Sequence, residues 1–242
     1  MHYVISDIHG NTRRFASIMA QIRLQPEDTL YVLGDVVDRH DGGIAILLQL
    51  MQMPNVKMVL GNHEYLMLRA LGCPYDNEVL NPFTQEWAIE HWYRNGGQIT
   101  HQKWKRRRKE NREKIINFLY SLPLSLDLQL NGINYKLVHA APAELYDFDK
   151  KYKDAMEFAV WKRLWPEDVL PEDYILVFGH TPTKYFEDIA PMQVWKGQNR
   201  IGIDCGSGYP EDPQDPKSKY GRLACLRLDD GKIFYSQEEV CT

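Results

Sequence analysis

The sequence TLYVLGDVVDR, residues 29–39, decides the fold of this chain. Residues 29–33 are a run of β-branched, aliphatic and aromatic side chains, which is typical of a buried strand. Gly34 ends the run, and the polar residues Asp35, Asp38 and Arg39 follow it directly. Because ligands in open α/β sheets bind at the carboxyl ends of strands, this pattern predicts a functional edge of a sheet.

Four other apolar runs are also followed by polar side chains. We expect strands at residues 3–6, 57–60, 133–138 and 174–178, with two more near 200–203 and 223–228. The polar residues that follow the first four are Asp7 and His9, then Asn62 and His63, then His139, and finally His180. With residues 29–39, five strand ends that carry Asp, Asn and His are therefore expected to converge on one place.

The apolar runs alternate with longer amphipathic stretches, which indicates an α/β fold. Helices are expected at residues 11–24, at 43–53 and after Asn62. Two more are expected at residues 84–93 and about 100–120, separated by a helix C-cap at 95–97 and ended before Pro123. We interpret residues 84–122 as a helical insertion in a single domain that spans residues 1–242.

The composition excludes several classes of protein. The chain has 242 residues with 12% aromatic side chains, too many for general disorder. No apolar run approaches about 18 residues, so no membrane span is expected, and the first residues lack the features of a signal peptide. Four cysteines without C-x-x-C spacing predict reduced thiols and a cytoplasmic protein. A net charge of −4 argues against nucleic acid as a structural partner.

One segment departs from this overall acidic balance. Residues 103–114 hold eight Lys or Arg and two Glu. The simplest interpretation is a solvated helix face. The alternative is a cationic rim that attracts acidic phosphopeptides or nucleotides.

The residue types at the strand ends predict a metal centre. Oxygen from Asp and Asn and nitrogen from His suit Mn, Fe, Zn or Ni, and the lack of Cys there argues against a thiolate site. Asp7 and His9 are two residues apart, so both point the same way from an extended strand end. These side chains offer more ligand atoms than one metal ion requires, so we expect two ions. Two divalent ions with Asp7 and Asp35 leave a positive site suited to a phosphate ester.

Five motifs, D-x-H, G-D-x-x-D-R, G-N-H-E, H-A and G-H-T, stand in this order at the strand ends. In this order they resemble the calcineurin-like metallophosphoesterases, and within them the phosphoprotein phosphatases in their short bacterial and bacteriophage form. The resemblance extends from Tyr3 to about Leu228. It implies a four-layer α/β/β/α sandwich with a helical insertion. It also implies a phosphatase that hydrolyses phosphoserine or phosphothreonine in proteins, with phosphotyrosine as a further candidate, by direct attack of a metal-bound hydroxide and without a phosphoenzyme.

The resemblance implies a role for each matching residue. One ion takes Asp7, His9 and Asp35, and the other takes Asp35, Asn62, His139 and His180. His63 matches the general acid, Asp38 the carboxylate that orients it, and Arg39 a phosphate-binding arginine. Asn62, Arg163 and Tyr209 complete the implied substrate contacts. The cofactor is expected to be two divalent ions, with Mn²⁺ first and Fe, Zn or Ni as alternatives.

Two positions depart from the phosphatase pattern. Leu60 stands where an arginine usually precedes G-N-H-E, and His40 stands where a glycine usually follows G-D-x-x-D-R. Leucine at the first position also occurs in bacterial diadenosine tetraphosphate hydrolases, so a bis(5'-nucleosyl)-tetraphosphatase with a nucleotide substrate is the alternative function. A cyclic-nucleotide phosphodiesterase is a weaker alternative. A non-catalytic scaffold is weaker still, because no motif residue such as His63 is missing. The sequence sets neither the oligomeric state nor the physiological substrate.

Overall fold

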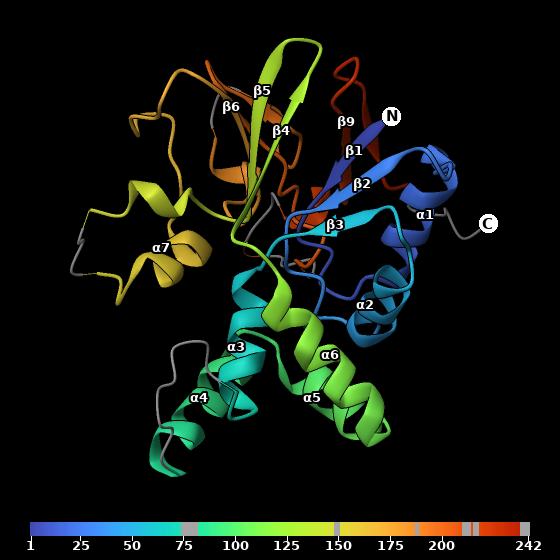
Figure 1. Ribbon diagram of the computed structural model, residues 1–242, viewed down its shortest axis with the longest axis vertical. Helices are drawn as coiled ribbons and strands as arrows, with labels where there is room; N and C mark the ends of the chain where they lie inside the picture. The colour runs from blue at the N-terminus through green and yellow to red at the C-terminus, as the bar shows by residue number, and fades with distance from the viewer. Residues whose placement is uncertain (74–81, 148–150, 187–188, 210–213, 215–217, 238–242) are drawn as a thin grey trace.

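Two five-stranded sheets pack face to face in the computed structural model, which describes residues 1–73, 82–147, 151–186, 189–209, 214 and 218–237 (Figure 1). The first sheet has the order β10-β9-β1-β2-β3. Its parallel strands are β1 (His2–Ile5), β2 (Thr29–Val32) and β3 (Val56–Met58). Strand β9 (Ala224–Arg227) runs antiparallel to β1, and β10 (Ile233–Tyr235) is antiparallel to β9.

The second sheet has the order β4-β5-β6-β8-β7. Strands β5 (Ile133–Val138), β6 (Ile175–Phe178) and β8 (Arg200–Gly202) are parallel. Two antiparallel strands form its edges, β4 (Ser125–Leu130) beside β5 and β7 (Trp195–Lys196) beside β8. The parallel strands of both sheets therefore offer carboxyl ends at which a site can form.

The alternation of side chains along each strand separates three apolar cores. In β1, Tyr3 and Ile5 face the helices while Val4 faces the second sheet. In β6, Val177 faces the first sheet while Leu176 and Phe178 face the outer side. One core thus lies between the sheets and one lies outside each of them, which confirms the four-layer α/β/β/α sandwich.

Helices cover both outer faces. Side chains of α1 (Thr12–Ile22), α2 (Gly43–Met51) and α3 (Asn62–Ala70) join the core on the first sheet. Helix α7 (Ala155–Trp161) contributes Phe158 to the core on the second sheet. Short 3₁₀ helices lie at Ala143–Leu145, Thr183–Tyr185 and Ser218–Tyr220.

Three further helices, α4 (Pro82–Arg94), α5 (Gln98–Lys105) and α6 (Lys109–Ser121), gather with α3 at one end of the molecule (Figure 1). The expected cap is present, since Gly96 has φ +95° and the N–H groups of Gly96 and Gly97 donate to carbonyls of the last turn of α4. The single helix expected at 100–120 is wrong. Helix α5 ends at Lys105, and Arg108, with a ψ of 150°, is the N-cap from which α6 begins. The Arg112 guanidinium carbon then lies 4.9 Å from the centre of the Trp104 ring.

The structure adds strands β4, β7 and β10 and helix α7 to the expected elements. Strand β4 had a sequence signal, because residues 125–130 alternate and Asn131-Gly132 follows them. Both turn residues have positive φ, +52° and +78°, as a two-residue hairpin requires. The other three elements are seven residues long or shorter, too short for a periodic pattern to stand out.

The structure bears on two expectations from the composition, reduced cysteines and the lack of a membrane span. Cys73, Cys205 and Cys225 are free thiols, and Cys241 lies outside the described residues. Over the part of the chain that the structure describes, none of the helices has the length and apolar character that crossing a membrane requires.

The outer core of the second sheet is expected to respond strongly to truncation. Phe178 is fully buried there against Trp195. Replacing it with Ala should lower the free energy of unfolding by about 3–5 kcal/mol, because the cavity adds to the lost transfer energy. Phe83, which is 80% exposed, supplies the matched control, and Phe83→Ala should cost less than about 0.5 kcal/mol. Urea unfolding of both variants measures the difference, and equal losses would contradict this assignment of the core.

Candidate metal centre

The strand ends of both sheets meet at one place. The turn after β1 carries Asp7 and His9, and the turn after β2 carries Asp35 and Asp38. Helix α3 begins with Asn62 and His63, while His139 follows β5 and His180 follows β6. All of these side chains are at least nine-tenths buried, so the polar cluster predicted from the sequence is a buried one.

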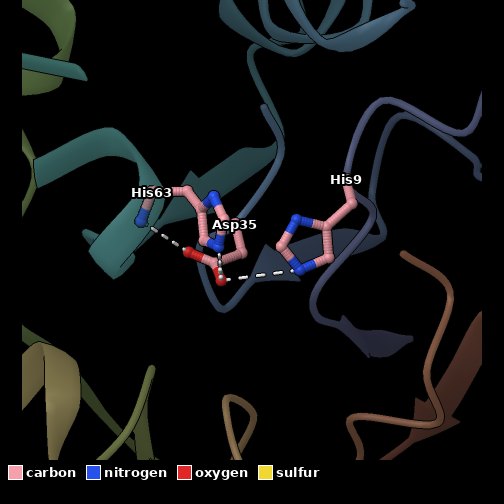
Figure 2. Close-up of side chains that lie close together, drawn as sticks. All are labelled: His9, Asp35 and His63. Carbon is pink, nitrogen blue, oxygen red and sulfur yellow. Dashed lines mark hydrogen bonds and ion pairs between the residues drawn. The ribbon is translucent and has the colours of Figure 1, made fainter. Parts of the chain in front are cut away.

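Asp35 lies at the middle of the cluster (Figure 2). Its Oδ2 is 3.6 Å from His9 Nε2 and 3.8 Å from His63 Nε2. Its Oδ1 is 3.5 Å from His139 Nε2 and accepts the backbone N–H of His63 at 3.0 Å. The carboxylate thus faces imidazole nitrogens from three different segments of the chain.

Backbone carbonyls set the orientation of three of these imidazoles. His9 Nδ1 lies 3.2 Å from the Val37 oxygen, and His139 Nδ1 lies 2.6 Å from the Leu33 oxygen. His180 Nε2 lies 3.1 Å from the Trp161 oxygen. A carbonyl only accepts, so each of these nitrogens carries the hydrogen and the other ring nitrogen presents a lone pair to the cluster.

These lone pairs face oxygen atoms. Asn62 Oδ1 is 2.8 Å from His139 Nε2 and 2.9 Å from His180 Nδ1. Asp7 Oδ1 is 3.8 Å from His9 Nε2. Acceptors that converge on acceptors repel one another unless a cation lies between them. The donor set therefore fits divalent metal ions, and the carbonyl contacts are the supports that metal-bound histidines normally have.

His63 differs from the other three imidazoles. Its Nδ1 lies 2.7 Å from Asp38 Oδ2, so a carboxylate rather than a carbonyl orients the ring. Its Nε2 is 3.4 Å from Nη2 of Arg39, a permanent cation. The same Asp38 oxygen accepts the indole N–H of Trp92 at 2.8 Å, and the Asp38 N–H donates to Thr100 Oγ1 at 2.9 Å. Neither Trp92 nor Thr100 was among the site residues predicted from the sequence.

The backbone around the site is held in an uncommon conformation. Six site residues have left-handed φ between +49° and +74°, namely Asp7, His9, Asp35, Asp38, Arg39 and His180. Such angles are rare outside glycine and persist only where the surroundings enforce them. Glu64 supplies one such constraint, because its carboxylate accepts the N–H groups of Asp35 and Val36 at 2.8 Å and of Val37 at 3.2 Å.

Burial sets the electrostatics of the cluster. It raises the pKa of Asp35 to about 7, where the charge of Glu64 adds to the effect and His63 opposes it. Burial also raises the pKa of Asp38 to about 7 and lowers the pKa of His63 to about 4. The pKa values of His9 and His180 fall well below their usual range for the same reason. Neutral imidazoles beside carboxylates that lack a countercharge are the state that a bound cation stabilises.

A cavity of about 50 Å³ opens over the cluster. Its walls include the predicted substrate residues Arg39, Arg163 and Tyr209. Asp204 also lines it, is buried, and was missed in the sequence. The signal was available, because Asp204 follows strand β8 just as Asp7 follows β1.

Leu60 and His40, the two positions that depart from the phosphatase pattern, lie in different surroundings. Leu60 is fully buried against Tyr65 and Val160. His40 is half-buried with its Nδ1 3.0 Å from the His9 carbonyl oxygen, and it lines a second cleft of about 450 Å³ beside Arg39 and Arg94. The structure thus places His40 beside the site and Leu60 behind it.

Removing and restoring a divalent cation is expected to change stability in a pH-dependent way. In the unfolded chain Asp35 is ionised above about pH 4, whereas in the folded protein it keeps its proton up to its pKa of about 7. The stability that protonated Asp35 contributes to the folded state is therefore lost as the pH rises through 7. The buried imidazoles oppose this only up to about pH 6.5, where the unfolded histidines lose their protons. Metal-free protein should therefore lose stability between pH 6.5 and 8.

A cation should reverse this loss because it replaces the protons. Mn²⁺ at about 100 times its Kd should add about 3 kcal/mol at pH 8 and less at pH 6.5. Thermal unfolding of stripped and reloaded protein measures the gain, with Asp35→Asn as the control that should show almost none. A gain that is equal at both pH values would contradict this account of the cluster.

Comparison with known proteins identifies the family to which the chain belongs. The family model of calcineurin-like phosphoesterases matches residues 3–204. A Salmonella typhimurium protein named serine/threonine-protein phosphatase 2 is 27% identical over 214 residues, covering 85% of this chain and 87% of the relative. A Serratia proteamaculans symmetrical bis(5'-nucleosyl)-tetraphosphatase is 38% identical, but over only 68 residues, or 27% of this chain and 24% of the relative.

Solved structures share the fold at low identity. A protein serine/threonine phosphatase from Saccharomyces cerevisiae superposes with a TM-score of 0.56 and 15% identity, over 98% of this chain and 79% of that one. The family match ends before strands β9 and β10 but includes all the strand-end motifs and the cluster around Asp35. This chain belongs to the calcineurin-like phosphoesterase family and is a metal-dependent phosphoester hydrolase.

Proposed function

We propose that the protein is a phosphomonoesterase that removes phosphate from phosphoserine or phosphothreonine in proteins, with phosphotyrosine as a further candidate. The observation that carries this proposal is the extent of the match to the relatives named serine/threonine-protein phosphatase 2. That match covers 85% of the chain, whereas the match to the tetraphosphatases covers 27%. The compartment proposed for it is the cytoplasm.

Two divalent ions are proposed as the cofactor, with Mn²⁺ first and Fe, Zn or Ni as alternatives. Asp7, His9 and Asp35 would hold one ion, while Asp35, Asn62, His139 and His180 would hold the other. His63 also lies within reach of Asp35, but the Arg39 guanidinium next to its Nε2 disfavours a second cation there. When bound, the two ions supply an activated water molecule and neutralise phosphate charge.

The chain's own groups would perform the remaining chemistry. His63 protonates the leaving oxygen of the substrate, and Asp38 keeps the His63 ring in orientation through its 2.7 Å contact. Arg39 and Arg163 line the cavity and would bind the non-bridging phosphate oxygens through their planar guanidinium groups. Asn62 and Tyr209 are the other proposed substrate contacts, and both line the same cavity. Cys205 is buried and its thiol pKa is raised, so it is a poor nucleophile.

The second candidate function is hydrolysis of a dinucleoside polyphosphate. It is favoured by Leu60, which brings no positive charge to the site, and by the local match to the tetraphosphatases. The basic segment 103–114 does not decide between the two functions. Lys103 pairs with Asp41 at 2.9 Å, and the exposed Arg106 and Arg108 lie at the break between α5 and α6.

A substrate panel separates the two functions. With Mn²⁺ restored, kcat/KM for a phosphoserine or phosphothreonine peptide should exceed that for diadenosine tetraphosphate by about tenfold or more, a difference of about 1.4 kcal/mol. His63→Asn should lower kcat on the better substrate by about 10²–10⁴, the usual contribution of a general acid. If the dinucleotide is the better substrate, the protein-phosphatase proposal fails and the nucleotide function takes its place.

Arg163 is expected to act on the phosphate. Arg163→Ala should lower kcat/KM by about 10- to 100-fold, because a charged hydrogen bond contributes about 1.5–3 kcal/mol. Arg106→Ala removes an equal charge from the exposed end of α5 and should change kcat/KM less than twofold. Steady-state kinetics on the phosphopeptide measure both variants. Equal effects of the two substitutions would exclude a direct phosphate contact by Arg163.

A further inference from the structure

Two N–H donors converge on one oxygen of Asp38. His63 Nδ1 lies 2.7 Å from Oδ2, and the Trp92 indole nitrogen lies 2.8 Å from the same atom. The other oxygen, Oδ1, is buried and has no hydrogen-bond partner among the described residues. The carboxylate could therefore turn about its Cβ–Cγ bond were it held by His63 alone, and Trp92 is the second donor that holds Oδ2 toward the imidazole.

Trp92 itself has little freedom to move. It lies on α4 and is fully buried, and its ring packs directly on Gly97, where an added Cβ would clash with the indole. The same turn also contacts Arg39, the residue next to Asp38, because the Gly96 carbonyl accepts the Arg39 N–H at 3.1 Å. The cap between α4 and α5 is thus in contact with both Trp92 and Arg39.

The backbone of Asp38 is held from the same side. Thr100, on α5, accepts the Asp38 N–H at 2.9 Å. Asp38 and Arg39 have φ of +74° and +66°, a conformation that needs such support. Helix α4 therefore holds the side chain of Asp38 together with His63 on α3, and helix α5 holds its backbone.

We propose that Trp92 is a positioning residue for proton transfer: its N–H locks Asp38 Oδ2 against His63, so that the imidazole is aimed at the leaving oxygen. This inference rests on the proposed role of His63 as the general acid. It assigns the helices α4 and α5 a part in the reaction itself. It also distinguishes Trp92 from a core tryptophan, whose ring matters and whose N–H does not.

The test varies the need for a proton on the leaving group. An alkoxide such as that of phosphoserine needs protonation as it leaves, whereas p-nitrophenolate leaves without it. Trp92→Phe should lower kcat on a phosphoserine peptide about tenfold, the size expected for losing a hydrogen bond to a charged group. KM for the peptide and kcat on p-nitrophenyl phosphate should both stay within about twofold.

Trp104 provides the matched control. It lies on α5, and its buried indole nitrogen has no hydrogen-bond partner in the described structure. Trp104→Phe should leave the ratio of the two kcat values unchanged. Where Trp92→Phe fails to fold, incorporation of benzothienylalanine at position 92 keeps the ring shape and replaces only the N–H by sulfur. This isostere should give the same loss on the peptide alone.

Two outcomes overturn the inference, and they differ in what else they affect. Equal losses on both substrates in Trp92→Phe or the isostere, or no loss on either, show that the N–H does not act through His63. His63→Asn serves as the reference, and it should show the same contrast between substrates with a larger loss. If His63→Asn lowers both substrates equally, the proposed acid role of His63 fails, and the inference about Trp92 fails with it.

Discussion

The buried carboxylate of Asp35 is the constraint on which the rest of the site depends. It is 1% exposed and faces imidazole nitrogens from the segments after β1, β3 and β5. A carboxylate that is removed from water costs several kcal/mol unless positive charge or N–H donors replace the water. Its place is fixed by the fold, because Gly61 approaches so closely that any side chain there would meet the Asp35 amide and carboxylate. Glu64, one helical turn further on, then holds the N–H groups of Asp35 and Val36.

Around this centre, the backbone carbonyls decide what each histidine can do. The rings of His9, His139 and His180 each donate to a carbonyl and present the opposite nitrogen as a lone pair. His63 has a carboxylate in the same position. The negative charge of an ionised carboxylate favours a protonated ring and so opposes the burial that lowers the pKa of His63, whereas a carbonyl only orients a neutral ring. The four imidazoles thereby divide into three that present a lone pair to the cluster and one whose partner is a carboxylate, which is the division that the proposed roles as cation ligands and general acid require.

The strand ends were predictable because the signal is local. A run of apolar residues followed within one or two positions by Asp, Asn or His can be recognised without the tertiary structure, and Asp7, Asp35 and His139 all follow such a run. Asp204 follows the same rule and would have been found by applying it to strand β8. The break between α5 and α6 had no such signal, since residues 106–108 contain neither glycine nor proline. The bond from Trp92 to Asp38 joins residues 54 positions apart, and a buried tryptophan in a helix has the same pattern whether or not its N–H has a partner.

Position 60 shows how packing and charge are linked at the edge of the site. Leu60 packs on Val160 and Tyr65, with Trp161 beside them. Helix α7 ends at Trp161, whose carbonyl orients His180, and Arg163 follows two residues later at the wall of the cavity. An arginine at position 60 would lose this apolar contact, because its charge is costly to bury there. The leucine therefore does more than omit a positive charge: it anchors the segment that orients His180 and brings Arg163 to the cavity. The position of Arg163, which we propose to bind phosphate, thus depends on an apolar residue that lies behind the site.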